Sequence, residues 1–225
     1  MRKLLIAIAC LFVLQTANAQ ITGGIKLGLS TNDVTQDDFV AAYTNGSFDS
    51  LKVSLLGAGV GLHGGAFIRI PVSKLFYVQV EPLLGSSRFN YQLDSITAGG
   101  VTADVQEGFE SFRNLDLKLI AGIQLGLPAD IKLRGHAGLV PSIVLSNQSD
   151  LWDTQNYGAT WNSMKWGYLL GVGADLGSFT VDVNFVSGIS NFGNEFSVGG
   201  QSYTLDEARP SSTVVTVGYK LFGKG

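Results

Sequence analysis

Residues 164–185 read MKWGYLLGVGADLGSFTVDVNF, and this stretch decides the fold class. Apolar side chains occupy every second position before and after Gly177-Ser178, and glycine or polar residues fill most positions between them. Successive side chains of a strand point to opposite faces, so an alternation of period two indicates a strand. A two-residue connection that contains glycine is typical of a β-hairpin. The stretch therefore predicts two antiparallel strands, each with one apolar face and one mixed face.

The same alternation occurs in eight segments of the chain. We expect strands near residues 21–30, 57–70, 75–90, 109–125, 131–139, 164–176, 179–185 and 212–222. Short turns at 71–74, 126–130 and 177–178 alternate with long segments near 31–56, 88–108, 147–163 and 190–211. Transmembrane β-barrels show this alternation, because their periplasmic turns are short and their outer loops are long. The sequence predicts an all-β fold, an eight-stranded antiparallel up-and-down transmembrane β-barrel with both chain ends in the periplasm.

Aromatic residues mark both ends of the predicted strands on the apolar face. The set near the short turns is Phe76, Phe179 and Tyr219, and the outer set is Trp166, Tyr168 and Phe185. Such belts are expected where amphipathic rings settle at the two membrane interfaces. A soluble β-sandwich or lipocalin is the alternative, but its aromatic residues would pack inside. The opposite face mixes glycines with charges, which favours the membrane barrel over a lipocalin cavity.

The first residues have the composition of a secretory signal peptide. Arg2 and Lys3 form a positive segment, and residues 4–14 form an apolar segment that is too short to span a bilayer. Ala17-Asn18-Ala19 then provides a cleavage site with small residues, so we expect cleavage between Ala19 and Gln20. Residues 1–19 are the predicted signal peptide, and residues 20–225 are the predicted barrel domain.

Cys10 is the only cysteine of the chain, and it falls within the predicted signal peptide. It would be a lipoprotein cysteine only if Ala7-Ile8-Ala9 preceded the cleavage point, which would leave almost no apolar segment. Cleavage after residue 19 removes it, so the mature chain is expected to have neither disulfides nor thiolate metal sites.

Composition excludes several classes of protein. The 29 glycines follow no Gly-x-y period, so the chain is not collagen-like. The formal net charge is −3 and no basic cluster occurs, which argues against nucleic acid as a partner. After residue 19 no apolar run is long enough for a spanning helix, so residence in a membrane would require a closed barrel.

Charged residues of both signs fall on the face opposite the apolar one. An eight-stranded barrel is only wide enough for side chains to fill it, so we expect these charges to pair inside. Arg69 and Glu81 lie at nearly matched distances from the turn at 71–74 and are the predicted pair. A filled interior also predicts negligible conductance. The predicted interior network comprises Arg69, Glu81, Asp116, Lys118, Lys132, Arg134, Asp175 and Asp182.

Two histidines, His63 and His136, share the inward positions. Zinc binding is one interpretation, but no carboxylate accompanies them at ligand spacing. A serine–histidine lipid hydrolase is another, but no motif identifies the nucleophile. We expect both to be hydrogen-bonded interior residues. The sequence accordingly predicts no catalytic, cofactor-binding or metal site.

The long outer segments are the expected binding regions, because loops carry function on a rigid scaffold. Their aromatic and acidic residues could form an adhesive or partner-binding surface. Asp33 with Asp37-Asp38 resembles a calcium site only loosely, since the regular ligand spacing is missing. The loop residues in question are Asn32-Asp33, Asp37-Asp38, Tyr43, Trp152, Tyr157 and Trp161.

Five segments resemble the PorT-like outer-membrane β-barrel family of Bacteroidota. They are VQVEPLL at 78–84, AGLVP at 137–141, GVGAD at 171–175, VSGISN at 186–191 and VGYKLF at 217–222. The resemblance spans essentially the whole predicted mature chain and implies an outer-membrane barrel. Because the family takes its name from a component needed to secrete surface proteases, it also implies a role in secretion.

These observations support three hypotheses of function. The leading one is a monomeric barrel in outer-membrane lipid, with a structural or binding role through its surface loops. The second is an accessory subunit of a protein secretion or envelope assembly machine, with a protein partner in the envelope. The third, a lipid-modifying barrel enzyme, is the least favoured, so the protein is not expected to be an enzyme.

Overall fold

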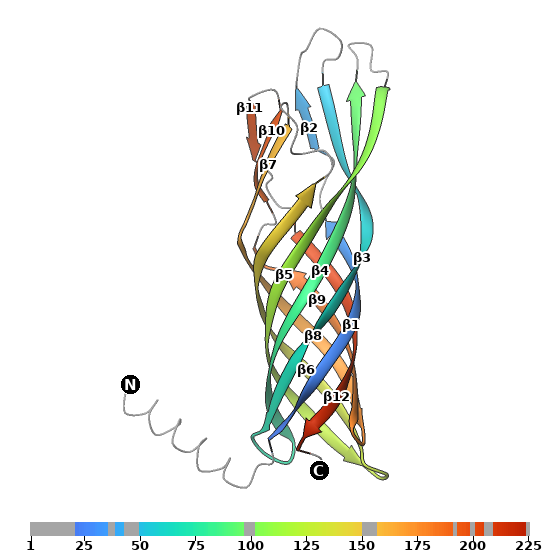
Figure 1. Cartoon of the computed structure of the whole chain (residues 1–225), viewed down its shortest axis with the longest axis vertical. Helices are drawn as coiled ribbons and strands as arrows, with labels where there is room; N and C mark the ends of the chain where they lie inside the picture. Colours follow the sequence, from blue (N-terminus) through green and yellow to red (C-terminus); the bar gives the residue numbers. More distant parts are fainter. Residues whose placement is uncertain are drawn as a thin grey trace, which may run out of the picture.

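The computed structural model describes residues 21–35, 39–42, 50–96, 102–149, 157–190, 193–198, 201–204 and 209–223. Eight antiparallel strands pair side by side in the order β1-β12-β9-β8-β6-β5-β4-β3 (Figure 1). The ring is closed because β3 also pairs with β1. The strands are β1 (Thr22–Thr35), β3 (Ser50–Pro71), β4 (Phe76–Ile96), β5 (Thr102–Leu127), β6 (Ile131–Ser149), β8 (Met164–Leu176), β9 (Phe179–Gly188) and β12 (Arg209–Phe222). The predicted eight-stranded up-and-down barrel is confirmed.

Short turns connect β3 to β4, β5 to β6 and β8 to β9 at one end of the barrel, where β1 begins and β12 ends (Figure 1). All three fall where the sequence predicted them. Ala129 and Asp130 have φ values of 64° and 55°, and Gly177 has 58°. A positive φ at Gly177 is the conformation that two-residue hairpins require, and glycine adopts it without strain.

The barrel wall is apolar outside and polar inside. Leu27 is 71% exposed, whereas its neighbour Lys26 is 1% exposed. The predicted outward aromatic residues follow the same rule, and Phe179 packs edge-to-face on Tyr219 with ring centroids 5.4 Å apart. Exposed leucines and buried charges are the reverse of a soluble core, and they fit a wall that faces hydrocarbon.

None of the described residues belongs to a helix that is long and apolar enough to cross a membrane.

The strands continue into segments that were expected to be long loops. β4 extends to Ile96 and β5 begins at Thr102, so most of the region 88–108 is a two-stranded ribbon. β3 begins at Ser50, and the short strand β2 (Phe39–Ala42) pairs with it. β7 (Tyr157–Trp161), β10 (Gly193–Val198) and β11 (Gln201–Thr204) form a separate small sheet. The expectation of irregular loops there was wrong.

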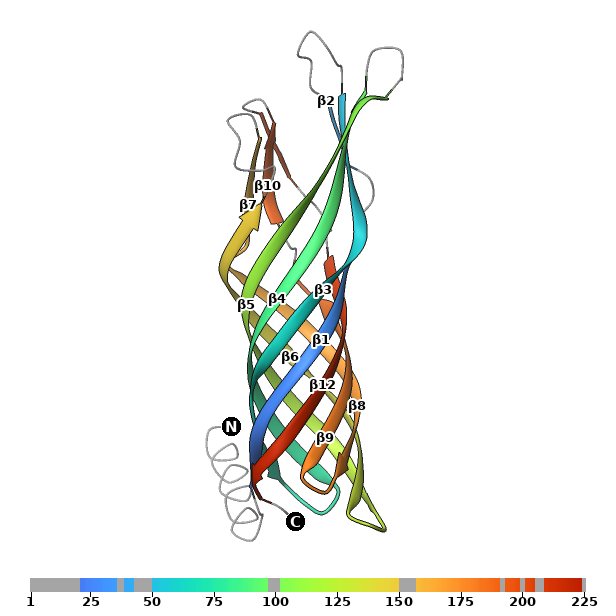
Figure 2. The ribbon, with the colours of Figure 1, turned by 45° about the vertical axis from the view of Figure 1, so that its right-hand side comes forward.

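Two protrusions therefore rise from the end of the barrel opposite the short turns (Figures 1 and 2). One, the ribbon protrusion, consists of the outer parts of β3, β4 and β5 with β2. The other, the sheet protrusion, consists of β7, β10 and β11.

The ladder is irregular in the outer half of the barrel. The β3–β4 register shifts between Leu55 and Ala58 and again between Ala58 and His63. The β5–β6 register shifts between Arg113 and Asn114. Such bulges bend a strand and re-aim its side chains. They lie at the level where the interior is less completely filled.

Candidate functional site in the barrel interior

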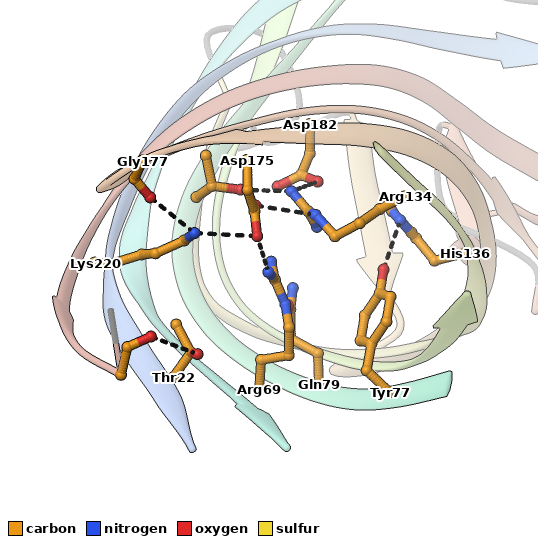
Figure 3. Close-up of polar contacts among 12 residues, drawn as sticks. Thr22, Arg69, Tyr77, Gln79, Arg134, His136, Asp175, Gly177, Asp182 and Lys220 are labelled. Atoms are coloured by element: carbon orange, nitrogen blue, oxygen red, sulfur yellow. Dashed lines mark hydrogen bonds and ion pairs between the residues drawn. The ribbon is translucent and has the colours of Figure 1, made fainter. Parts of the chain in front are cut away.

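Asp175 on β8 is the centre of the interior charges, and three cations from three other strands converge on it (Figure 3). Arg69 Nη1 lies 2.6 Å and Lys220 Nζ 3.1 Å from Asp175 Oδ2. Arg134 Nε lies 3.1 Å from Asp175 Oδ1. Lys220 Nζ also donates to the carbonyl oxygen of Gly177 at 3.0 Å. This carboxylate ties β3, β6 and β12 to β8 across the lumen.

A second layer surrounds Asp182 on β9. Lys26 Nζ lies 2.7 Å from Asp182 Oδ2 and forms a short contact with Glu81 Oε1. Arg134 Nη2 lies 2.8 Å from Asp182 Oδ1, so one guanidinium joins the two layers. We call these residues the charge network, which comprises Lys26, Arg69, Glu81, Arg134, Asp175, Asp182 and Lys220.

Glycines make room for the charge network. A Cβ on Gly173 would lie 2.1 Å from Asp182 Oδ1 and 2.8 Å from Arg134 Nη2. A Cβ on Gly171 would lie 2.3 Å from Asn184 Oδ1 and 2.5 Å from His136 Nε2. The glycines that alternate with apolar residues in β8 therefore let side chains from β6 and β9 reach over that strand.

His136 is hydrogen-bonded on both ring nitrogens. The Tyr77 hydroxyl lies 3.2 Å from Nδ1, and Asn184 Oδ1 lies 2.7 Å from Nε2. Both partners are buried, with exposures of 1% each. His136 is thus a satisfied interior residue, as the sequence predicted.

The predicted pair between Arg69 and Glu81 is wrong. Arg69 stands opposite Gln79 in the β3–β4 ladder and donates from Nε to Gln79 Oε1 at 2.5 Å. Its ion pair is with Asp175, and that of Glu81 is with Lys26. Equal distance from a turn does not fix a pair inside a barrel, because strands tilt and side chains reach across the lumen.

Among the other predicted network residues, Arg134, Asp175 and Asp182 belong to the charge network. Lys132 is half-buried and stands opposite Asp175 in the β6–β8 ladder. Asp116 is not part of the charge network, and Lys118 stands directly opposite Glu81 in the β4–β5 ladder, at the outer border of the network. Sequence reasoning missed Lys26, although its inward position between Ile25 and Leu27 was the signal that would have identified it.

The outer half of the interior contains a cavity of about 100 Å³ with both polar and apolar lining residues, which we call the chamber. His63, Asn114, Asp116, Lys118 and Lys165 are among the residues that line it. Ser142 Oγ donates to Asp116 Oδ1 at 2.6 Å. The chamber lies on the side of the charge network that faces away from the short turns. It is beside the register shifts of β3–β4 and β5–β6.

Ser30, His63 and Asp116 form a chain in the wall of the chamber. Ser30 Oγ lies 2.9 Å from His63 Nε2, and Asp116 Oδ2 lies 3.7 Å from His63 Nδ1. This order resembles a serine–histidine–aspartate hydrolase site. Ser30 is only 2% exposed, however, and the residues lining the chamber do not include it. The geometry shown is that of a buried hydrogen-bonded chain beside the chamber.

Within the described ranges, no three His, Cys, Asp or Glu side chains lie close enough together to hold a metal ion. The predicted signal peptide with its cleavage site at Ala19 and Gln20 lies outside the described residues, as do Asp37-Asp38, Tyr43 and Trp152. Tyr157 and Trp161 are described as backbone of β7, without their side chains.

The fold and its reversed polarity define a class: a transmembrane β-barrel with a charged interior. Residues 15–194 match the family of the outer membrane protein beta-barrel domain. The chain belongs to this family and resides in the outer membrane. No curated protein matches its sequence.

Solved barrel structures resemble the chain at low identity. Neisserial surface protein A has 9% identity and a TM-score of 0.44, over 88% of this chain and 97% of that one. The attachment invasion locus protein Ail of Yersinia pestis has 11% identity and a TM-score of 0.37, over 89% and 98%. The outer membrane protease OmpT of Escherichia coli has 11% identity and a TM-score of 0.41, over 90% and 96%.

Proposed function

We propose that this protein is a non-conducting barrel that carries two β-structured protrusions for binding at the cell surface. The observation behind the proposal is the length of β4 and β5, which remain paired beyond the apolar belt. Leu84 is 60% exposed on the outward face, and the next outward positions of β4 are Ser86 and Arg88. The pairing continues to Asp94 and Val105, so an ordered ribbon extends past the hydrocarbon.

The charge network supports the non-conducting part of the proposal. Its seven side chains are at most 5% exposed, and they join strands from all sides of the lumen. Ions would have to break several buried ion pairs to pass. We expect no reproducible channels in planar bilayers, and stable openings of the wild-type protein would contradict the proposal.

Closure of the ring supports a monomeric barrel. Because β1 pairs on both sides, the ring leaves no free strand edge at which a second barrel could add. The protrusions differ in this respect, since β2 and β11 lie at the ends of their sheets in the described part of the chain. Sheet edges are places where a strand of a partner protein can add. The proposal therefore assigns binding to the protrusions and assigns no enzymatic role to the interior.

An accessory role in secretion or envelope assembly is the second candidate, because the chain resembles the PorT-like barrels. The resembling segments 78–84, 137–141, 171–175 and 217–222 all lie in strands of the barrel wall. Membership in that group and a secretion partner follow from this resemblance alone. The protrusions do not contribute to it.

Crosslinking and affinity isolation from native outer membranes in mild detergent tests both candidates. A ribbon variant would replace residues 89–110 with Asn-Gly, which joins the register partners Arg88 and Ser111 by a hairpin turn. A matched sheet variant would replace residues 196–203 with Asn-Gly between the partners Glu195 and Thr204. We expect a partner protein that is isolated with the wild-type barrel to be absent from the isolate of one variant and present in that of the other. A partner retained by both variants would contradict binding through the protrusions and favour docking by the barrel.

A further inference from the structure

Lys118 is a buried cation that the surrounding protein does not satisfy. Its side chain is 2% exposed, and Nζ has no hydrogen-bond partner among the described residues. Glu81 stands directly opposite it in the β4–β5 ladder, but Glu81 Oε1 accepts from Lys26 and Gln79 instead. The carboxylates of Glu81 and Asp116 lie near enough to offset part of the charge of Lys118, but a buried ammonium without a hydrogen-bond partner is still costly. A buried group in this condition indicates a missing water or ion.

The chamber provides space at this position, and Lys118 lines it. Its volume of about 100 Å³ equals that of roughly three waters, or of one tetrahedral oxyanion of similar size. Two ammonium groups, Lys118 and Lys165, face the single carboxylate of Asp116 in this lining. Asp116 accepts from Ser142 and lies near His63, and the side chains that line the chamber include two ammonium groups and one carboxylate.

Other groups around the chamber suit an oxyanion. Asn114 Nδ2 lies 3.2 Å from Ser87 Oγ, which leaves the Ser87 hydroxyl hydrogen available. Ser211 and Ser212 line the same space from β12. Lys165 Nζ lies 4.6 Å above the ring of Phe112, which fixes its ammonium at the chamber wall. Hydroxyl donors and fixed ammonium groups are typical of sites for phosphoryl groups.

We propose that the chamber is a binding site for a phosphoryl group, with the Lys118 ammonium as its principal ligand. The group is either free phosphate or the headgroup of a phosphorylated lipid. Water would supply hydrogen bonds to Lys118, whereas an oxyanion supplies hydrogen bonds together with an opposite charge. This inference concerns the barrel interior and is independent of what the protrusions bind.

Titration of the full protein, purified in a phosphate-free maltoside detergent, tests the site with inorganic phosphate as the probe. Phosphorus NMR and calorimetry would follow binding to wild type, to Lys118→Met and to the control Lys74→Met, which removes an exposed lysine of the β3–β4 turn. We expect saturable binding to wild type and to Lys74→Met, and an affinity about 10- to 100-fold weaker in Lys118→Met, the effect of one charged hydrogen bond. Equal binding by all three proteins, or no Lys118-dependent binding of either phosphate or short-chain phosphatidic acid, overturns the proposal and leaves the chamber to water or an adventitious ion only.

A second arm replaces phosphate with short-chain phosphatidic acid in bicelles. Lys118-dependent binding of the lipid without binding of free phosphate assigns the site to a headgroup, and the reverse result assigns it to the free anion. Either result supports the proposal.

Stability gives an independent readout if Lys118→Met alters folding. Without phosphate, Lys118→Met should be at least as stable as wild type, because it removes a buried ammonium that has no hydrogen-bond partner among the described residues. Phosphate should raise the urea midpoint of wild type only, since a ligand stabilises the state that binds it. If Lys118→Met is destabilised equally with and without phosphate, Lys118 is a structural partner of Glu81 and the proposal is wrong.

Discussion

The two halves of the barrel interior bury charge in different ways. Near the short turns, four cations and three carboxylates form a network in which every member has an ion pair within 3.1 Å. In the outer half, the same kind of wall encloses a chamber whose Lys118 has no protein partner among the described residues. The difference shows that an eight-stranded barrel is not uniformly filled.

The first way to test this contrast is to neutralise one carboxylate in each half. Asp175→Asn leaves Arg69, Arg134 and Lys220 without their common counter-charge, so we expect a loss of about 3–5 kcal/mol in the free energy of unfolding. Asp116→Asn keeps an oxygen that accepts from Ser142, and we expect a loss of about 1 kcal/mol. Urea unfolding in detergent, read by the gel shift between folded and boiled barrels, measures both. Similar losses would show that the halves do not differ.

The histidines provide a second comparison between the halves. His136→Ala leaves the Tyr77 hydroxyl and Asn184 Oδ1 buried without their partner, at a cost of about 2–3 kcal/mol. His63→Ala removes one hydrogen bond with Ser30 beside a chamber that water can enter, and should cost about 1 kcal/mol. The same unfolding assay measures the difference. Outer-membrane lipid profiles should be unchanged in the double variant, and a changed profile would revive an enzymatic role.

Glycines that border the network give a third comparison. The groups that Gly173→Ala would displace, Asp182 Oδ1 and Arg134 Nη2, are held by other ion pairs and have little freedom to move. We expect a loss of about 1–3 kcal/mol, as for other overpacked interiors. Gly135→Ala is the matched control, because its Cβ would meet no atom nearer than 3.8 Å. It should change stability by no more than about 0.5 kcal/mol. Equal effects would mean that the network can rearrange.

The sequence predicted the direction of the side chains better than their partners. The alternation of Leu117, Lys118 and Leu119 is enough to place leucine in lipid and lysine in the lumen, because a strand has only two faces. The short turns were equally predictable from their glycine, proline and polar residues. Which charges meet inside depends on strand tilt and stagger, and local sequence does not carry that information.

The protrusions were missed for a different reason. Residues 88–108 are polar enough to be taken for a loop, yet Phe89, Tyr91 and Leu93 alternate with polar residues. This alternation was a strand signal of the same period as in the wall. The chamber had no such signal, because its lining comes from several strands that lie far apart in the sequence.

A double-mutant cycle tests the finest element of the comparison, the choice of partner inside the network. Arg69→Met and Asp175→Asn remove the two ends of the 2.6 Å ion pair, and we expect a coupling energy of about 1–2 kcal/mol. Arg69→Met with Glu81→Gln should give a smaller coupling energy, because these two residues form no ion pair with each other and are linked only through Gln79 and the other network residues. For the same reason, Glu81→Arg should not rescue Arg69→Glu. A larger coupling of Arg69 to Glu81 than to Asp175 would mean that neighbouring strands, rather than strands across the lumen, pair the buried charges.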